Sequence, residues 1–298
     1  MKKQLAFVLG GGGARGALQV GALRALMEAG YQPDLLVGTS AGAINATFMA
    51  VRGMSLQSIT ELVQAWHDAA TAEFFPQNYL WLTVRALFRR PDVHTSHRLR
   101  DFFVSHGLGP ELRFGDIQGI RLVLVATDLN ASQLALYGLD PAEYVLEGLL
   151  ASTALPPWVT PIERDGSLLM DGGAISTLPI EPAMLTGATE IIALDLYDPN
   201  SLPHEPNGFG PFLAKLLNTV ERRQTEMELA LASARRVPVH YLHLRAPDSV
   251  PLWDFSHAGE LIETGYELAR AEIPRWQAES KPRFLKWLQG FIEGTIGP

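Results

Sequence analysis

Residues 4–42 read QLAFVLGGGGARGALQVGALRALMEAGYQPDLLVGTSAG and contain the pattern that decides the fold. An apolar run at 4–9 ends in four glycines, and apolar residues then recur at helical spacing as far as Gly30, a capping glycine. A second apolar run at 34–37 leads into a tight turn and another helical segment, 41–51. Strand, glycine loop, helix, strand, turn and helix in this order predict a parallel α/β sheet.

The rest of the chain continues this pattern. Apolar runs predict further strands, and helical spacing predicts further helices: strands at 120–126, 190–196 and 237–244, a turn at 164–167 between two short strands, and helices at 212–236, 259–273 and 283–292. We therefore expect an α/β fold with a mainly parallel central sheet and a helical C-terminal part. We expect residues 1–200 to form the core, and residues 201–298 to form a helical C-terminal extension packed on it within the same domain.

Composition excludes several classes of protein. The chain has 298 residues, of which 47% are hydrophobic and 19% are charged, so a mainly disordered protein is excluded. It has no cysteine, which excludes disulfide scaffolds, thiolate nucleophiles and cysteine-based metal sites. The net charge of −8 argues against nucleic-acid binding. No apolar run approaches the ~20 residues of a membrane span, so we expect a cytoplasmic protein, with peripheral membrane contact as an open alternative.

The glycine loop at 11–16 satisfies the pattern G-x-G-x-x-G between a strand and a helix. Asp34 follows at about the distance expected of a ribose-binding acid, so a dinucleotide site is one interpretation. Successive backbone N–H groups at a helix N-terminus also bind negative charge, including a developing oxyanion. A turn without a ligand is the third interpretation.

The turn Gly38-Thr39-Ser40-Ala41-Gly42 satisfies the pattern G-x-S-x-G, again between a strand and a helix. This is the context of a nucleophile elbow, in which flanking glycines leave room for a cramped turn that exposes the serine hydroxyl. The sequence therefore predicts Ser40 as a nucleophile, and this favours the oxyanion interpretation of the glycine loop.

A serine hydroxyl needs a neighbouring base to act as a nucleophile. None of the eight histidines lies in an obvious catalytic setting. Asp171 directly follows the apolar run 168–170 and precedes two glycines, which lets the backbone approach closely and directs the carboxylate outward. Asp171 is thus a second candidate base, although a D-G-G sequence is more often an ordinary turn, and a histidine base stays open.

Together the three blocks at 11–16, 38–42 and 171–173 resemble the signature of the patatin-like phospholipase family, of the bacterial type. The small-residue block 151–156 (ASTALP) is similar to the segment ahead of that family's catalytic acid, and the resemblance covers roughly residues 4–195. Residues 176–179 (STLP) depart from the family, whose members often carry Asn shortly before this proline, and the difference affects loop geometry more than chemistry.

The resemblance implies a patatin-like three-layer α/β/α fold with a mainly parallel central sheet. It also implies a lipid acyl hydrolase that forms an acyl-enzyme through a Ser–Asp dyad. It implies no cofactor and no metal. The implied site residues are the catalytic Ser40 and Asp171, the oxyanion-hole residues Gly11, Gly12, Gly13 and Arg15 (the last as a support of the loop), the elbow glycines Gly38 and Gly42, and the acid-loop glycines Gly172 and Gly173. A Ser-His-Asp lipase and, less favoured, a dinucleotide-binding oxidoreductase remain alternatives.

Two short segments combine basic and large apolar residues, as interfacial helices do. They are residues 79–90 and 283–292, and both are candidates for peripheral contact with a membrane that contains the lipid substrate. Each also fits an ordinary amphipathic helix packed on the core. Residues 74–90 fit a lid over an acyl pocket equally well.

Overall fold

The computed structural model describes residues 3–72, 93–156, 159–199 and 209–280. Their strands form one eight-stranded sheet in the order β5-β6-β3-β2-β1-β7-β8, with β4 also paired to β3. The strands are β1 Leu5–Leu9, β2 Leu35–Thr39, β3 Arg121–Asp128, β4 Gln133–Tyr137, β5 Ile162–Arg164, β6 Ser167–Asp171, β7 Glu190–Asp195 and β8 Val239–His243. The central five strands, from β3 to β8, are parallel, whereas β4, β5 and β6 pair antiparallel.

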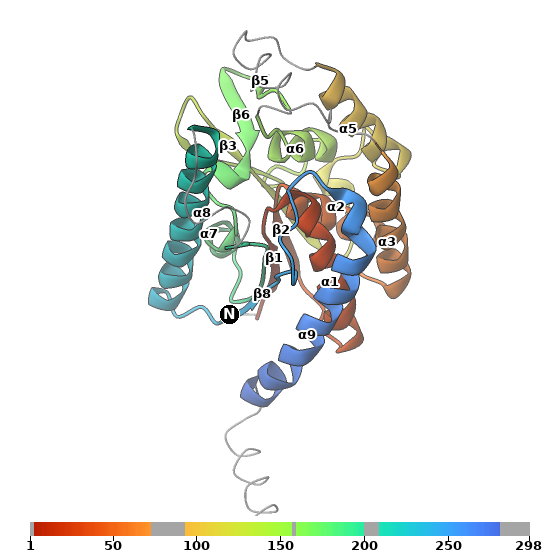
Figure 1. The fold of residues 1–298 in the computed structure, drawn as a ribbon, viewed down its shortest axis with the longest axis vertical. Helices are drawn as coiled ribbons and strands as arrows, with labels where there is room; N and C mark the ends of the chain where they lie inside the picture. The colour runs from red at the N-terminus through yellow and green to blue at the C-terminus, as the bar shows by residue number, and fades with distance from the viewer. Residues whose placement is uncertain (1–2, 73–92, 157–158, 200–208, 281–298) are drawn as a thin grey trace, which may run out of the picture.

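Helices cover both faces of the sheet (Figure 1). They are α1 Ala17–Glu28, α2 Ala41–Arg52, α3 Leu56–Thr71, α5 Val93–Ser105, α6 Val145–Ser152, α7 Ile180–Leu185, α8 Phe209–Ala234 and α9 Ala258–Ser280. Alternate residues of β1 point to opposite faces: Phe7 and Leu9 join the core under α1, α2, α3, α6 and α9, whereas Ala6 and Val8 join the core under α7 and α8. The expected three-layer fold with a mainly parallel sheet is confirmed.

The C-terminal part of the chain contributes to both the sheet and the helical layers. β8, the strand expected at 237–244, lies parallel to β7 at the edge of the sheet. Helix α9 crosses α1 so closely that a Cβ on Gly21 would lie 1.8 Å from the carbonyl oxygen of Ile262. The boundary near residue 200 stays a prediction, and the described residues after it are packed on the same core.

The register of four adjacent strands brings three loops to one edge of the sheet. Leu9 of β1 pairs with Gly38 of β2, so the glycine loop and the Ser40 turn leave neighbouring strands at the same level. Val125 of β3 pairs with Thr39, and the next residue, Ala126, pairs with Asp171 of β6. Asp171 therefore lies at the same level of the sheet as the Ser40 turn. The carboxyl ends of parallel strands are where α/β proteins place their sites.

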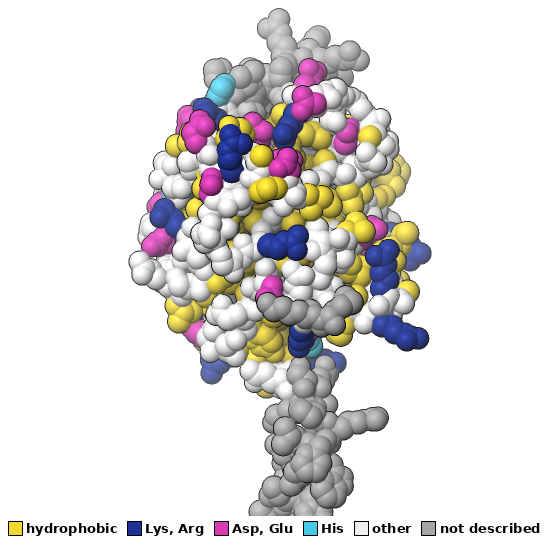
Figure 2. Space-filling view, turned by 180° about the vertical axis from the view of Figure 1, so that it is seen from behind, with side chains coloured by type: hydrophobic (Ala, Val, Ile, Leu, Met, Phe, Trp, Pro, Cys, Tyr) yellow, Lys and Arg dark blue, Asp and Glu magenta, His cyan; other side chains and the backbone are white. Residues whose placement is uncertain are grey.

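Charged side chains are interspersed on the face seen from behind (Figure 2). Among the residues described on that face, Lys and Arg are scattered among other side chains and form no continuous basic stripe of the kind that follows a nucleic-acid backbone. None of the helices within the described ranges is long and apolar enough to cross a membrane.

Candidate active site

Ser40 lies in a strained turn between β2 and α2. Its φ of 53° and ψ of −120° are unusual for a residue with a side chain, and strain of this kind is what a nucleophile elbow requires. The Ser40 N–H donates to Ser152 Oγ at 3.0 Å, and Ser152 Oγ–H donates to the carbonyl of Val125 at 2.6 Å. Ser152, at the end of α6, therefore holds the turn against β3.

The flanking glycines are required by close backbone contacts. A Cβ on Gly38 would lie 2.5 Å from the carbonyl oxygen of Gly42, and a Cβ on Gly42 would lie 2.1 Å from that of Leu9. Since both distances are far shorter than a van der Waals contact, no larger residue fits. The local geometry of G-x-S-x-G is thus compatible with a nucleophile elbow, and the role of Ser40 as a nucleophile stays a prediction.

Asp171 is a buried carboxyl beside Ser40. It ends β6, its residue is 3% exposed, and its Oδ1 accepts the Gly173 N–H at 2.8 Å. Burial raises the pKa of Asp171 to about 6, and the Ser40 hydroxyl and the Gly173 N–H act in the opposite direction. Oδ2 is buried and has no hydrogen-bond partner among the described residues. The Ser40 hydroxyl is therefore close enough to influence this carboxyl without forming a completed hydrogen bond, as is common before substrate binds.

The glycine loop lies directly against Ser40. A Cβ on Gly11 would be 3.2 Å from the Cβ of Ser40. The Gly11 N–H, however, donates to the carbonyl of Thr177 at 2.9 Å, so it is occupied within the protein. In the described part of the chain the N–H groups of Gly12 and Gly13 have no acceptor. Of the three glycine N–H groups expected to bind an oxyanion, those of Gly12 and Gly13 therefore remain available, and that of Gly11 does not.

Arg15 lies behind the glycine loop and is buried. Its Nε donates to the Gly12 carbonyl at 3.3 Å, and its own backbone N–H donates to the same oxygen at 3.2 Å. A trans peptide directs its N–H opposite to its C=O, so these bonds turn the Gly13 N–H away from Arg15. Burial lowers the pKa of Arg15, and nearby carboxylates, chiefly Asp198, act against this. The side chain is placed to orient the loop, and its role as a support of an oxyanion hole stays a prediction.

A second carboxyl, that of the half-buried Glu221 of α8, shares this region. Burial raises its pKa to about 7, the charge of Arg15 lowers it, and the charge of Asp171 raises it further. Sequence inspection missed Glu221, because a single glutamate within a helical pattern carries no signal of its surroundings. It also missed the role of Ser152, although the block that contains it was recognised.

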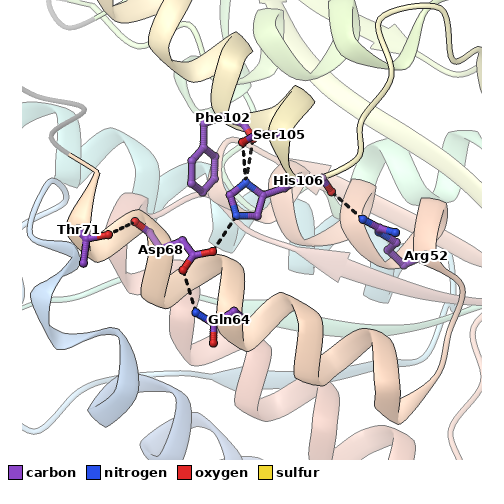
Figure 3. A network of polar contacts seen from close by, with 7 residues as sticks. All are labelled: Arg52, Gln64, Asp68, Thr71, Phe102, Ser105 and His106. Carbon is purple, nitrogen blue, oxygen red and sulfur yellow. Dashed lines mark hydrogen bonds and ion pairs between the residues drawn. The ribbon is translucent and has the colours of Figure 1, made fainter.

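His106, which follows α5, is engaged in a polar network away from Ser40 (Figure 3). His106 Nε2 contacts Asp68 Oδ2 at 3.1 Å, and its Nδ1 lies 2.9 Å from the carbonyl of Phe102 and 3.2 Å from Ser105 Oγ. Both ring nitrogens are thus occupied in a pair that joins α3 to α5, and the pair has no contact with Ser40. Among the described residues no histidine is hydrogen-bonded to Ser40, so the Ser-His-Asp alternative gains no support.

The dinucleotide interpretation is wrong for Asp34. Its carboxylate accepts the N–H of Leu5, at the start of β1, at 2.9 Å. The glycine loop follows Leu9 at the other end of that strand, roughly 13 Å away at the usual rise of a strand. An acid at the opposite edge of the sheet cannot bind the ribose of a nucleotide held by the loop.

Within the described residues no group of three or more His, Cys, Asp or Glu side chains is arranged to hold a metal ion. The segments 79–90 and 283–292, predicted to contact membranes, and the lid candidate 74–90 lie outside the described residues.

Comparison with known proteins identifies the family. A family model described as "Patatin-like phospholipase" matches residues 7–184, which include the glycine loop, Ser40 and Asp171. The chain belongs to the patatin-like phospholipase family. Human patatin-like phospholipase domain-containing protein 6 is 31% identical over 292 residues, covering 91% of this chain and 20% of its own length. Mouse patatin-like phospholipase domain-containing protein 7 is 29% identical over the same number of residues, covering 91% and 21%.

A fungal relative, lysophospholipase nte1 of Aspergillus terreus, is 26% identical over 312 residues, covering 93% of this chain and 18% of its own length. The chain thus spans about a fifth of the length of these curated relatives. Human GIVD cytosolic phospholipase A2, solved with methyl gamma-linolenyl fluorophosphonate, has a TM-score of 0.50 and 11% identity over 91% of this chain and 58% of that structure. This likeness indicates a shared patatin-like fold.

Proposed function

We propose that the chain is a lipid acyl hydrolase that cleaves acyl esters through a Ser40–Asp171 dyad and an acyl-enzyme. The observation that carries the proposal is the strained Ser40 turn beside a buried carboxyl whose Oδ2 is free to accept a proton. Membership of the patatin-like phospholipase family supports a lipid ester as substrate.

The first half-reaction acylates Ser40. As Ser40 Oγ attacks the ester carbonyl carbon, Asp171 Oδ2 accepts the hydroxyl proton, and the N–H groups of Gly12 and Gly13 stabilise the oxyanion. The bond to the alcohol oxygen then breaks, and Asp171 returns the proton to that oxygen. The positive end of α2, which begins at Ala41, points at the same centre and favours the developing charge.

The second half-reaction releases the fatty acid. A water molecule gives a proton to Asp171 as its oxygen attacks the acyl-enzyme, and the proton then returns to Ser40 Oγ when the acyl–oxygen bond breaks. A pKa of about 6 suits this role, because Asp171 is mainly ionised at neutral pH and yet basic enough to accept a proton. Asp171 therefore acts as base and acid alternately, without a histidine.

An apolar pocket near Ser40 fits the acyl chain. Ile44 of α2 is part of its lining, and the Ile44 N–H donates to the Ser40 carbonyl at 3.1 Å. The other lining residues come mainly from α2, α3, α5 and α6 and include Phe48, Trp66 and Leu149. Most of the lining side chains are apolar, with Arg52 and His106 among the exceptions, so the pocket offers burial to an alkyl chain.

Peripheral membrane contact through 79–90 and 283–292 is part of the same proposal. Co-sedimentation with phospholipid vesicles should weaken in a Trp81→Ala/Trp287→Ala double variant. Undiminished binding would reject both segments as anchors.

A fluorophosphonate label mapped by mass spectrometry tests the central claim. We expect it on Ser40, and we expect Ser40→Ala and Asp171→Asn to lose hydrolysis of lipid esters while staying folded. A panel of phospholipid, lysophospholipid and neutral-lipid substrates then assigns the lipid class. A folded Asp171→Asn variant with full activity would exclude the dyad and return the search to histidine.

A further inference from the structure

Glu228 of α8 is a buried carboxylate with two fixed hydrogen bonds. The residue is 8% exposed, its Oε1 accepts the Ser176 hydroxyl at 2.5 Å, and its Oε2 accepts the Glu181 N–H at 2.8 Å. Burial raises its pKa to about 7, while these hydrogen bonds act in the opposite direction. The proposed mechanism gives Glu228 no chemical step, so this buried carboxylate and its hydrogen bonds need another explanation.

Ser176 connects Glu228 to both halves of the dyad. Its carbonyl accepts the Thr39 hydroxyl at 2.9 Å, and Thr39 is the residue immediately before Ser40. Its N–H donates to the carbonyl of Gly172, the residue immediately after Asp171, at 2.9 Å. Ser176 and Thr39 are both fully buried, so water does not compete for these bonds. One residue thus contacts the segment of the nucleophile and the segment of the acid.

The loop 172–177, here called the acid loop, is anchored on two sides. On one side Gln224, one turn before Glu228 on the same face of α8, donates to the carbonyl of Ala174 at 2.9 Å. On the other side the Thr177 carbonyl accepts the Gly11 N–H. Helix α8 therefore binds the acid loop on one side. On its other side the acid loop contacts the glycine loop and the Ser40 turn.

We propose that Glu228 is a positioning residue that fixes the acid loop, and with it the distance between Asp171 and Ser40. The inference rests on the proposed dyad. Among the described residues the Asp171 carboxyl accepts one hydrogen bond, from the Gly173 N–H, which itself belongs to the acid loop. A shift of the loop would move the free Oδ2 relative to Ser40, and a misplacement of about 1 Å costs about 100-fold in rate.

The departure from the family pattern noted at 176–179 lies at this point. The serine at 176 supplies both the hydroxyl that Glu228 binds and the carbonyl that Thr39 binds. A carboxylate that merely capped α7 would need only the Glu181 bond. The Ser176 bond is therefore the part of the arrangement that distinguishes positioning of the dyad from support of a helix.

The test compares Glu228→Ala with a matched control, Glu226→Ala, using the full chain and a soluble p-nitrophenyl ester. Glu226 lies on the exposed side of α8 and pairs with Arg222. For Glu228→Ala we expect kcat to fall roughly 10- to 100-fold with little change in KM, by loss of alignment. We expect Glu228→Gln, which keeps an acceptor for Ser176, to recover most of this loss, and Glu226→Ala to match the wild type.

Hydrogen exchange of the acid-loop amides supplies a readout that needs no activity. We expect faster exchange at 172–177 in Glu228→Ala than in the wild type or in Glu226→Ala. If the wild type proves inactive, the proposed function fails, and the exchange rates alone decide whether Glu228 holds the loop.

A folded Glu228→Ala variant with wild-type kcat overturns the inference. Should that variant not fold, Ser176→Ala, which keeps the Glu181 bond, takes its place. Wild-type kcat in folded Ser176→Ala overturns the inference equally, and a selective loss of kcat supports it.

Discussion

Replacing Asp171 by Asn should abolish hydrolysis and at the same time stabilise the protein at neutral pH. Burial raises the pKa of Asp171 from 3.8 to about 6, so the folded state holds a proton that the unfolded state has released. Stability therefore falls as the pH rises from about 4 to about 6 and stays lowered above that range. At about 1.4 kcal/mol per pKa unit, the ionised carboxylate costs about 3 kcal/mol at neutral pH.

Asn removes this cost, because it does not ionise and its Oδ1 can still accept the Gly173 N–H. We expect the free energy of unfolding, measured by urea denaturation at about pH 8, to rise by up to about 3 kcal/mol. At about pH 5 the gain should shrink to roughly half, because the wild-type carboxyl is then mostly protonated in the folded state. Loss of the Asp171 charge also removes its repulsion of the Glu221 carboxylate, and this further raises the free energy of unfolding at neutral pH.

Asp101→Asn is the matched control, since Asp101 is an exposed residue of α5. We expect it to change the free energy of unfolding by less than about 0.5 kcal/mol at either pH. The reasoning is refuted if Asp171→Asn is no more stable than the wild type at about pH 8, or if its gain does not depend on pH. Either result would mean that Asp171 is not a desolvated base.

Three further outcomes are expected. The rate of ester hydrolysis should fall about tenfold per pH unit below an apparent pKa of about 6, which is that of Asp171. The reason is that the protonated carboxyl cannot accept the Ser40 proton. A flat pH–rate profile would contradict this. Ser152→Ala should destabilise the fold by about 1–3 kcal/mol and lower kcat, because the Ser40 N–H and the Val125 carbonyl both lose a hydrogen-bond partner. Urea denaturation measures the first effect and ester kinetics the second. Leu149→Trp should reduce kcat/KM for long acyl chains more than for short ones in a chain-length series, and an unchanged preference would exclude the pocket.

The local elements of the fold could be predicted from the sequence because their signals are local. The runs at 4–9 and 34–37 became β1 and β2, and the helical spacing at 41–51 became α2. β4 was missed, since its residues are half-buried and its five letters, QLALY, carry little alternation. Its place in the sheet comes from pairing with β3, which no short window of sequence contains.

The site was predictable in its residue types but not in its bonds. Ser40 and Asp171 stood out through their glycines. By contrast, the use of the Gly11 N–H by Thr177 depends on two segments that are distant in the sequence and meet only in the folded protein. Glu228 could not be predicted for the same reason. Within α8 it occupies an ordinary helical position, and its partner Ser176 comes from the packing of α8 on the acid loop.

The energetics of the site explain why distant elements hold it. A backbone as strained as that of Ser40 costs about 1–3 kcal/mol, and the buried charge of Asp171 adds about 3 kcal/mol, against a typical net stability of about 5–15 kcal/mol. Such a turn and such a carboxylate would relax unless neighbours fixed them. Ser152 of α6 supplies this support from one face of the sheet and Glu228 of α8 from the other. Helices without a chemical step are therefore as necessary to this arrangement as the dyad, and activity should respond to changes in either layer.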